Sequence, residues 1–140
     1  MSTEENKALV RQAIEKVWNA HNVAAVDDLY AAGLVNHDPL NPEVTGLEAF
    51  KAWVSAVFSS FPDLRVVVDD MVAEGDKVAK VYTLHGTQKG EFQGIPPTDK
   101  PVAMNGITIY RIADGKIAEL TWSYNMLGLM MQLGVIPAPG

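Results

Sequence analysis

Hydrophobic residues recur with a helical period through the first part of the chain. A first amphipathic helix is predicted from residues spaced at i, i+4, i+7 and i+8 on one face, namely Val10, Ile14, Val17 and Trp18. Ser2 and Glu5 have the spacing of a capping box and predict where this helix begins. A later helix presents a similar apolar stripe, formed by Leu47, Phe50, Trp53, Val54, Val57 and Phe61. Pro62 is expected to end it.

The segment between these two helices is less regular. A short second helix is predicted from about Val23 to Ala31, with Asn22 as its cap. The residues from Leu34 to Pro39 are typical of a turn that leads into a loop rich in Pro and Asn. Thr45 and Glu48 have capping-box spacing and predict the start of the third helix.

From Leu64 onward the pattern changes to strands. Four are predicted, over Leu64–Glu74, Val78–Gln88, Val102–Ile112 and Ile117–Tyr124, with a last helical turn or two after them. Helices followed by an antiparallel meander indicate an α+β fold over residues 1–140, with three N-terminal helices on one face of a curved, mainly antiparallel sheet. A deep apolar pocket between helices and sheet is then the expected ligand site.

Composition excludes several classes of function. The chain has no cysteine, which excludes disulfides, thiolate metal sites and a cysteine nucleophile. Its net charge of −6 argues against nucleic-acid binding, because phosphate recognition needs a basic patch. No apolar stretch reaches the roughly 18 residues of a membrane span, so no membrane partner is expected. The polar, acidic start lacks the regions of a signal peptide, and a cytoplasmic protein is expected.

Three histidines are the first candidates for chemistry. None lies within four residues of another, which excludes a helical two-histidine metal site, and no metal or cofactor is expected. His37 and Asp38 follow the second helix, where an imidazole or carboxylate could act as a base or hold a substrate oxygen. Alternatively they belong to a turn without a role in chemistry. His85 alternates with Tyr82 and Leu84 and is expected to point outward or into a subunit contact.

The last strand has an aromatic face and a polar face, and two arrangements are open. In one, the aromatic face of Leu120, Trp122 and Tyr124 is core and the polar face is solvated. In the other, the polar face of Thr121, Ser123 and Asn125 forms the pocket wall, and the aromatic side chains lie in a dimer interface. Asn125 would then contact a ligand at the strand end, with an amide that exchanges no proton near pH 7.

Four stretches resemble a known family. They are Asn36–Pro39, Phe61–Arg65, Gly90–Thr98 (Gly-Glu-Phe-Gln-Gly-Ile-Pro-Pro-Thr) and Leu127–Gly134, the last following Asp114–Ile117. In this order, over about residues 6–136, the chain resembles the SnoaL-like polyketide cyclase family of the nuclear-transport-factor-like superfamily. The resemblance implies a cone-shaped α+β roll with a deep hydrophobic pocket, often dimeric through the outer face of the sheet.

The resemblance also implies a reaction. Cyclases of this family close a polyketide ring by intramolecular aldol condensation without metal or cofactor, and an Asp near the end of the last strand is the acid/base. That position is Asn125 in this chain, so the expected acid/base is missing. We therefore expect a cofactor-independent cyclase acting on a small apolar carbonyl substrate, with His37 or Asp38 as base and Asn125 polarising an oxygen. Two alternatives stay open: another reaction on this scaffold (isomerisation, epoxide opening or hydroxylation), or a non-catalytic binder of a small hydrophobic ligand.

Further expectations concern the pocket wall and the dimer. The residues expected to bind substrate are Trp18, Phe50, Trp53, Met104 and Thr121. His37 and Asn125 are expected among the few polar groups of the pocket. A homodimer that packs sheet against sheet is expected, with Trp122 or Tyr124 at or near the contact.

Overall fold

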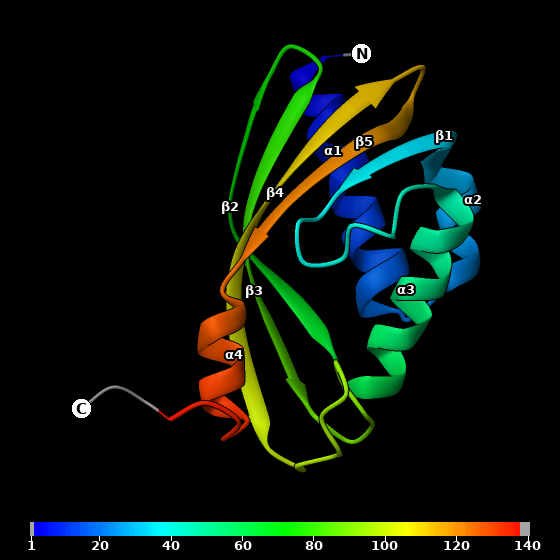
Figure 1. Ribbon diagram of the computed structural model, residues 1–140. Helices are drawn as coiled ribbons and strands as arrows, with labels where there is room; N and C mark the ends of the chain where they lie inside the picture. The colour runs from blue at the N-terminus through cyan, green and yellow to red at the C-terminus, as the bar shows by residue number, and fades with distance from the viewer. Residues whose placement is uncertain (1, 138–140) are drawn as a thin grey trace.

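Helices cover one face of a curved, unclosed sheet (Figure 1). The computed structural model describes residues 2–137. The helical segments of that range are α1 (Thr3–Ala13), η1 (Ile14–Asn19), η2 (Val23–Ala25), α2 (Val26–Leu29), α3 (Leu47–Ser60) and α4 (Met126–Gln132). The strands of that range are β1 (Tyr30–His37), β2 (Arg65–Glu74), β3 (Lys77–Thr87), β4 (Pro101–Ala113) and β5 (Lys116–Tyr124). The expected α+β architecture is therefore confirmed.

The first helix begins as predicted. The backbone N–H of Glu5 donates to Ser2 Oγ at 3.1 Å, and the N–H of Ser2 donates to Glu5 Oε1 at 3.1 Å, which completes the capping box. Its last turns continue as a π-helix, η1. The predicted apolar face, from Val10 to Trp18, is buried against the sheet.

The predicted second helix, about Val23 to Ala31, extends two residues too far. Helical structure ends at Leu29, and Tyr30 begins strand β1, which runs parallel to β5 as a fifth strand at the edge of the sheet. Backbone hydrogen bonds to β5 therefore hold Leu34–His37 as strand where a turn was predicted, and a turn follows only from Asp38, whose carbonyl accepts from the N–H of Asn41 at 3.0 Å. Asn22 does take the cap position before η2, although its side chain makes no cap hydrogen bond.

The predicted capping box of the third helix is also wrong. Gly46 is the N-cap of α3 and has extended backbone, and no side chain caps this end. Thr45 and Glu48 have the spacing of a capping box, but Thr45 lies one residue before the N-cap, where its side chain cannot complete the box. The end of the helix at Phe61, before Pro62, is as predicted.

The strand order in the sheet is β1-β5-β4-β3-β2. All neighbours are antiparallel except β1 and β5. Strand β4 extends beyond the end of β5, and α4 packs beside this extension. There the Gln132 side chain accepts from the N–H of Ala103 at 2.7 Å and donates to its carbonyl at 2.9 Å, so an amide occupies the place of a strand.

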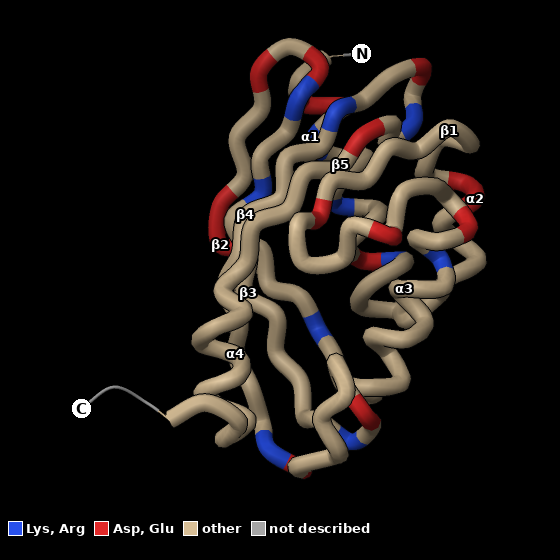
Figure 2. Tube along the Cα trace, in the orientation of Figure 1, with Lys and Arg blue, Asp and Glu red and all other residues tan. Residues whose placement is uncertain are grey.

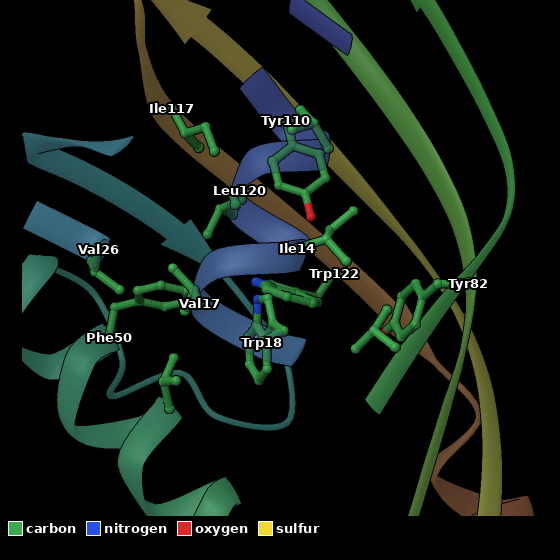
Figure 3. Packing of buried hydrophobic residues seen from close by; sticks show 14 of the residues in the cluster. Ile14, Val17, Trp18, Val26, Phe50, Tyr82, Tyr110, Ile117, Leu120 and Trp122 are labelled. Atoms are coloured by element: carbon green, nitrogen blue, oxygen red, sulfur yellow. The ribbon is translucent and has the colours of Figure 1, made fainter. Parts of the chain in front are cut away.

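The core lies between the helices and the concave face of the sheet. Figure 3 shows Trp18 and Val17 of η1 facing Trp122, Tyr82 and Leu120 of the strands. Charged residues are interspersed by sign and gather at the β2–β3 and β4–β5 turns (Figure 2). No helix within residues 2–137 has the length and apolarity needed to cross a membrane.

Candidate functional site

A hollow of about 60 Å³ lies between α3 and the concave face of the sheet. Its wall is mostly aromatic and aliphatic, with Trp18, Trp53, Tyr82, Met104, Trp122 and Leu129 among the lining residues. This volume is below the about 300–1,000 Å³ of typical small-molecule sites. A large ligand can therefore place only one end in the hollow, unless the lining side chains move to enlarge it.

Three tryptophans form one side of the hollow. Trp18 and Trp53 have ring centroids 5.8 Å apart, and Trp122 lies 6.2 Å from Trp18 and 5.7 Å from Trp53, all with edge-to-face geometry. Trp122 Nε1 donates to the buried Asn36 Oδ1 at 2.8 Å, and Asn36 Nδ2 donates to the Val44 carbonyl at 3.0 Å. This chain of hydrogen bonds fixes the orientation of the Trp122 ring from strand β1.

A buried carboxylate stands behind the wall. Asp38 follows β1 and is only 4% exposed. Its Oδ2 accepts from the Tyr124 hydroxyl at 2.8 Å and from Asn41 Nδ2 at 2.9 Å, and its Oδ1 accepts from the N–H of Leu40 at 3.0 Å. Both Tyr124 and Asn41 line the hollow. Burial, and then the Asp38 hydrogen bond, raise the pKa of Tyr124, so this phenol stays protonated.

A buried lysine completes the wall from β3. Lys80 is 1% exposed and lines the hollow. Its Nζ lies 4.1 Å from the ring centroid of Tyr82 and 5.4 Å from those of Tyr110 and Trp122. Burial lowers the pKa of the Lys80 ammonium to about 7. Near neutral pH, the hollow therefore contains a partly neutral amine.

The loop between β3 and β4 forms part of the wall of the hollow. The buried Gln88 organises this loop, since its Nε2 lies within hydrogen-bonding distance of the carbonyls of Gly90, Ile95 and Pro96. Its Oε1 accepts from the N–H and the hydroxyl of Thr98. The loop thereby holds Phe92 and Gln93 against the hollow. This is the Gly-Ile-Pro-Pro-Thr segment singled out in the sequence.

Several expected wall residues are where the sequence placed them. Trp18, Trp53 and Met104 line the hollow, and a role in binding stays a prediction for each. Phe50 does not line it, because the side chain is fully buried in the core, where it packs on Tyr30 and Trp53. His85 lies on the strand positions that alternate with Tyr82, as expected, and does not line the hollow.

Three predicted positions are wrong, because these side chains lie outside the hollow. His37 has a half-exposed side chain whose Nε2 lies 2.6 Å from Glu119 Oε2, at the surface. Asn125 is exposed and caps α4, accepting from the N–H of Gly128 at 2.9 Å. Thr121 is exposed on the outer face of β5. The strand-end position before Leu127–Gly134 thus starts a helix and does not face the pocket.

The two faces of β5 decide between the arrangements left open by the sequence. Leu120 and Trp122 are buried, Tyr124 is partly buried, and Thr121 and Ser123 are exposed. The aromatic face is therefore core and pocket wall under the helices, and a homodimer contact at or near Trp122 or Tyr124 stays a prediction. The physical reason is the helical layer, which covers the face with the larger apolar area.

Sequence reasoning missed Lys80, Asn41 and the partnership of Tyr124 with Asp38. A signal for Lys80 was available, since period 2 places it between Val78 and Tyr82 on the buried face of β3. No sequence signal pairs Tyr124 with Asp38, because 86 residues separate them. Within residues 2–137, no group of three or more His, Cys, Asp or Glu side chains is arranged to hold a metal ion.

Known proteins share this sequence and fold. The chain is 32% identical over 136 residues to the aklanonic acid methyl ester cyclase of Streptomyces sp. (strain C5), which covers 90% of this chain and 80% of that relative. It is 32% identical over 126 residues to the nogalonic acid methyl ester cyclase of Streptomyces nogalater, covering 83% of this chain and 90% of the relative.

Solved structures agree. The crystal structure of AclR from Streptomyces galilaeus superposes with a TM-score of 0.89 at 28% identity, over 99% of this chain and 87% of that one. The family of SnoaL-like polyketide cyclases matches residues 8–133, which include every strand, the aromatic hollow and the Asp38 network. With sequence, fold and site in agreement, the chain belongs to the SnoaL-like polyketide cyclase family.

Proposed function

We propose that this protein closes a ring in an apolar, polyketide-like carbonyl compound by an intramolecular aldol-type reaction. One observation carries the proposal: a buried carboxylate, Asp38, accepts a hydrogen bond of 2.8 Å from Tyr124 in the wall of an apolar hollow. The family of the chain and its methyl ester cyclase relatives support this class of reaction.

In the proposed chemistry, Tyr124 and Asp38 act as a proton relay. The phenolic oxygen of Tyr124 takes a proton from the carbon next to a substrate carbonyl, while its own proton passes to Asp38 Oδ2. The enolate carbon then attacks a second carbonyl of the same molecule, and the new alkoxide recovers the proton through the relay. The product is an isomer of the substrate, so no co-reactant is consumed.

Asn41 is proposed to hold the relay in place. Its Nδ2 lies within hydrogen-bonding distance of both Asp38 Oδ2 and the Tyr124 hydroxyl, at 2.9 and 3.0 Å. Gln93 Nε2 in turn approaches Asn41 Oδ1 at 3.4 Å. The apolar wall strengthens these interactions, because a low local dielectric weakens competition from water.

The test uses aklanonic acid methyl ester and nogalonic acid methyl ester as substrates, with a product of unchanged mass and altered retention as the readout. Asp38→Asn and Tyr124→Phe are expected to lower turnover about 10²- to 10⁴-fold, the usual contribution of general acid–base catalysis. Asn125→Ala and His37→Ala serve as matched controls, because both side chains lie outside the hollow. They are expected to retain activity.

Two results would overturn parts of the proposal. Full activity in both Asp38→Asn and Tyr124→Phe, with native circular dichroism, would remove the relay. Loss of activity in Asn125→Ala with unchanged stability would return the catalytic role to the position implied by the family resemblance.

A second candidate, a non-catalytic binder of a small hydrophobic ligand, is favoured by the aromatic wall itself. All three tryptophans of the chain line the hollow. Intrinsic fluorescence therefore reports directly on occupancy of this site. Saturable quenching by both methyl esters without any turnover would place the binder ahead of the enzyme.

A further inference from the structure

Lys80 is the charged residue that the aldol relay leaves without a role. It comes from the middle of β3, where its neighbours on the same face, Val78 and Tyr82, are also buried. Lysine is almost never fully buried unless it is paired with an opposite charge. Across residues 2–137, however, the structure contains no ion pair or hydrogen bond to Lys80 Nζ.

The surroundings of Lys80 are aromatic from three strands. Tyr82 lies on its own strand, Tyr110 on β4 and Trp122 on β5, all with ring centroids within 5.4 Å of Nζ. Burial raises the pKa of both tyrosines, so these neighbours are neutral phenols. The Tyr110 hydroxyl, whose ring lies deep in the core (Figure 3), has no hydrogen-bond partner among the described residues.

Folding stability alone does not explain this residue. An unpaired ammonium in an apolar site is unfavourable, and an aliphatic side chain of similar length would pack there at lower free energy. Burial without an opposite charge does, however, activate an amine, because desolvation in a hydrophobic pocket makes the neutral, nucleophilic form available.

From this geometry we propose that Lys80 is a nucleophile that forms a covalent Schiff base with a carbonyl ligand in the hollow. The ligand class is a β-dicarbonyl compound, whose apolar ends suit the aromatic wall and whose first carbonyl carbon is the point of attack. The site is Lys80, whose side chain lines the hollow.

The covalent step balances without an oxidant or reductant. Neutral Nζ adds to the carbonyl carbon, and a proton transfer gives a carbinolamine. This intermediate takes up a proton, loses the former carbonyl oxygen as water and becomes an iminium; the proton is returned in the next step. Loss of a proton from the adjacent carbon gives an enamine conjugated to the second carbonyl, and hydrolysis returns the lysine and the ligand.

A catalytic role for the Schiff base rests on the proposed function. An iminium at Lys80 would acidify the adjacent carbon of the substrate, which the Tyr124–Asp38 relay then deprotonates. The covalent site itself does not depend on turnover. It can therefore be tested with a small reagent that is not a cyclase substrate.

The experiment treats the folded, full-length protein with acetylacetone at pH 7. Reaction with an amine gives a conjugated enaminone, which absorbs in the near ultraviolet and adds the mass of one acetylacetone less one water. With the pKa near 7, about half of Lys80 is neutral, against about 1 in 10³ for an ordinary lysine. Peptide mapping is therefore expected to show labelling at Lys80 at least about 10²-fold faster than at exposed lysines.

Two variants make the test specific. Lys80→Met is expected to abolish the near-ultraviolet band, because a thioether fills the space without an amine. Lys77→Met, which removes an exposed lysine of the same strand, is expected to leave the band unchanged. Peptide mapping of the natural protein gives an answer that does not depend on either variant folding.

The outcomes separate this inference from the proposed function. Labelling of Lys80 no faster than of Lys77, or a band that persists in a folded Lys80→Met protein, overturns the Schiff base. If Lys80→Met retains cyclase activity and Lys80 of the natural protein is not labelled, the proposed function stands and the Schiff base is overturned. If Lys80 is labelled rapidly but neither methyl ester is turned over, the Schiff base stands and the proposed function is overturned.

Discussion

At the scale of a residue, burying the protonated form of Lys80 lowers the stability of the folded protein. In the unfolded chain its pKa is the ordinary 10.5, whereas in the folded protein burial lowers the pKa to about 7. Between these two values the unfolded chain binds a proton that the folded protein has released. Stability must therefore rise with pH across this window, and below about pH 7, where both states are protonated, this contribution stops changing.

This linkage gives a prediction for Lys80→Met. The variant is expected to unfold with a larger free energy at pH 7, by about 2–4 kcal/mol, because it removes an unpaired buried charge. Raising the pH from 7 to 9 should stabilise the natural protein by about 2 kcal/mol more than the variant. Urea unfolding of both proteins at pH 7, 8 and 9 measures this difference, and the shared histidines cancel from it. Parallel pH profiles would contradict the burial of a lysine with a shifted pKa.

At the scale of an element, the β3–β4 loop depends on Gln88. One fully buried amide meets three carbonyls and one N–H of the loop, together with the Thr98 hydroxyl. Gly90 allows the loop to approach the end of α3, because a Cβ there would lie 2.3 Å from the Ser59 carbonyl oxygen. Such contacts make an otherwise irregular segment a fixed part of the pocket wall.

Gln88→Glu is the matching substitution at this scale. It keeps the shape of the side chain but replaces a donor to the carbonyls with an acceptor, and about 2–3 kcal/mol of stability should be lost. Glu91→Gln, at an exposed position of the same loop, is expected to cost less than about 0.5 kcal/mol. Thermal unfolding gives both values, and amide exchange should show faster opening of residues 89–98 in Gln88→Glu. Equal effects of the two changes would mean that the loop does not depend on Gln88.

At the scale of the whole molecule, the outer face of the sheet exposes aliphatic side chains. Val81, Ile107 and Ile109 are each about 40% exposed there, and Val81 and Ile107 are paired across β3 and β4. Exposed apolar patches of this kind commonly mark a protein contact. We propose that a second copy of the chain covers this face, in the sheet-to-sheet homodimer expected from the sequence but with these aliphatic residues at the contact instead of Trp122 or Tyr124.

Light scattering over a range of concentrations tests this dimer. The natural protein is expected to have twice the monomer mass, and Ile107→Lys should shift it toward monomer, because a desolvated ammonium would face the twofold contact. Leu40→Lys, at an exposed position of the loop before α3, is the control and should leave the mass unchanged. A natural protein that stays monomeric at every concentration would refute the proposal.

Local pattern by itself determined the elements with a strong period. The buried face of α1 and η1, the stripe and end of α3, and strands β2 to β5 all follow from apolar spacing and from turns rich in Gly and Asp. Four short stretches were enough to indicate the family, which the comparisons confirm. These features are local, because spacing along the chain specifies which face of an element is apolar.

Only the tertiary structure decided what these faces meet. Tyr30–His37 forms a strand because it pairs in parallel with β5, and the spacing of apolar residues within this segment does not indicate such a partner. Asp38 meets Tyr124, and Lys80 meets the rings of Tyr110 and Trp122, through contacts between separate strands. Asn125 and His37 were assigned to the pocket by their place in the sequence, yet one caps a helix and the other pairs with Glu119 at the surface. Whether a side chain enters the hollow depends on the curvature of the sheet and the position of the helices above it, and these arise from packing of the whole chain.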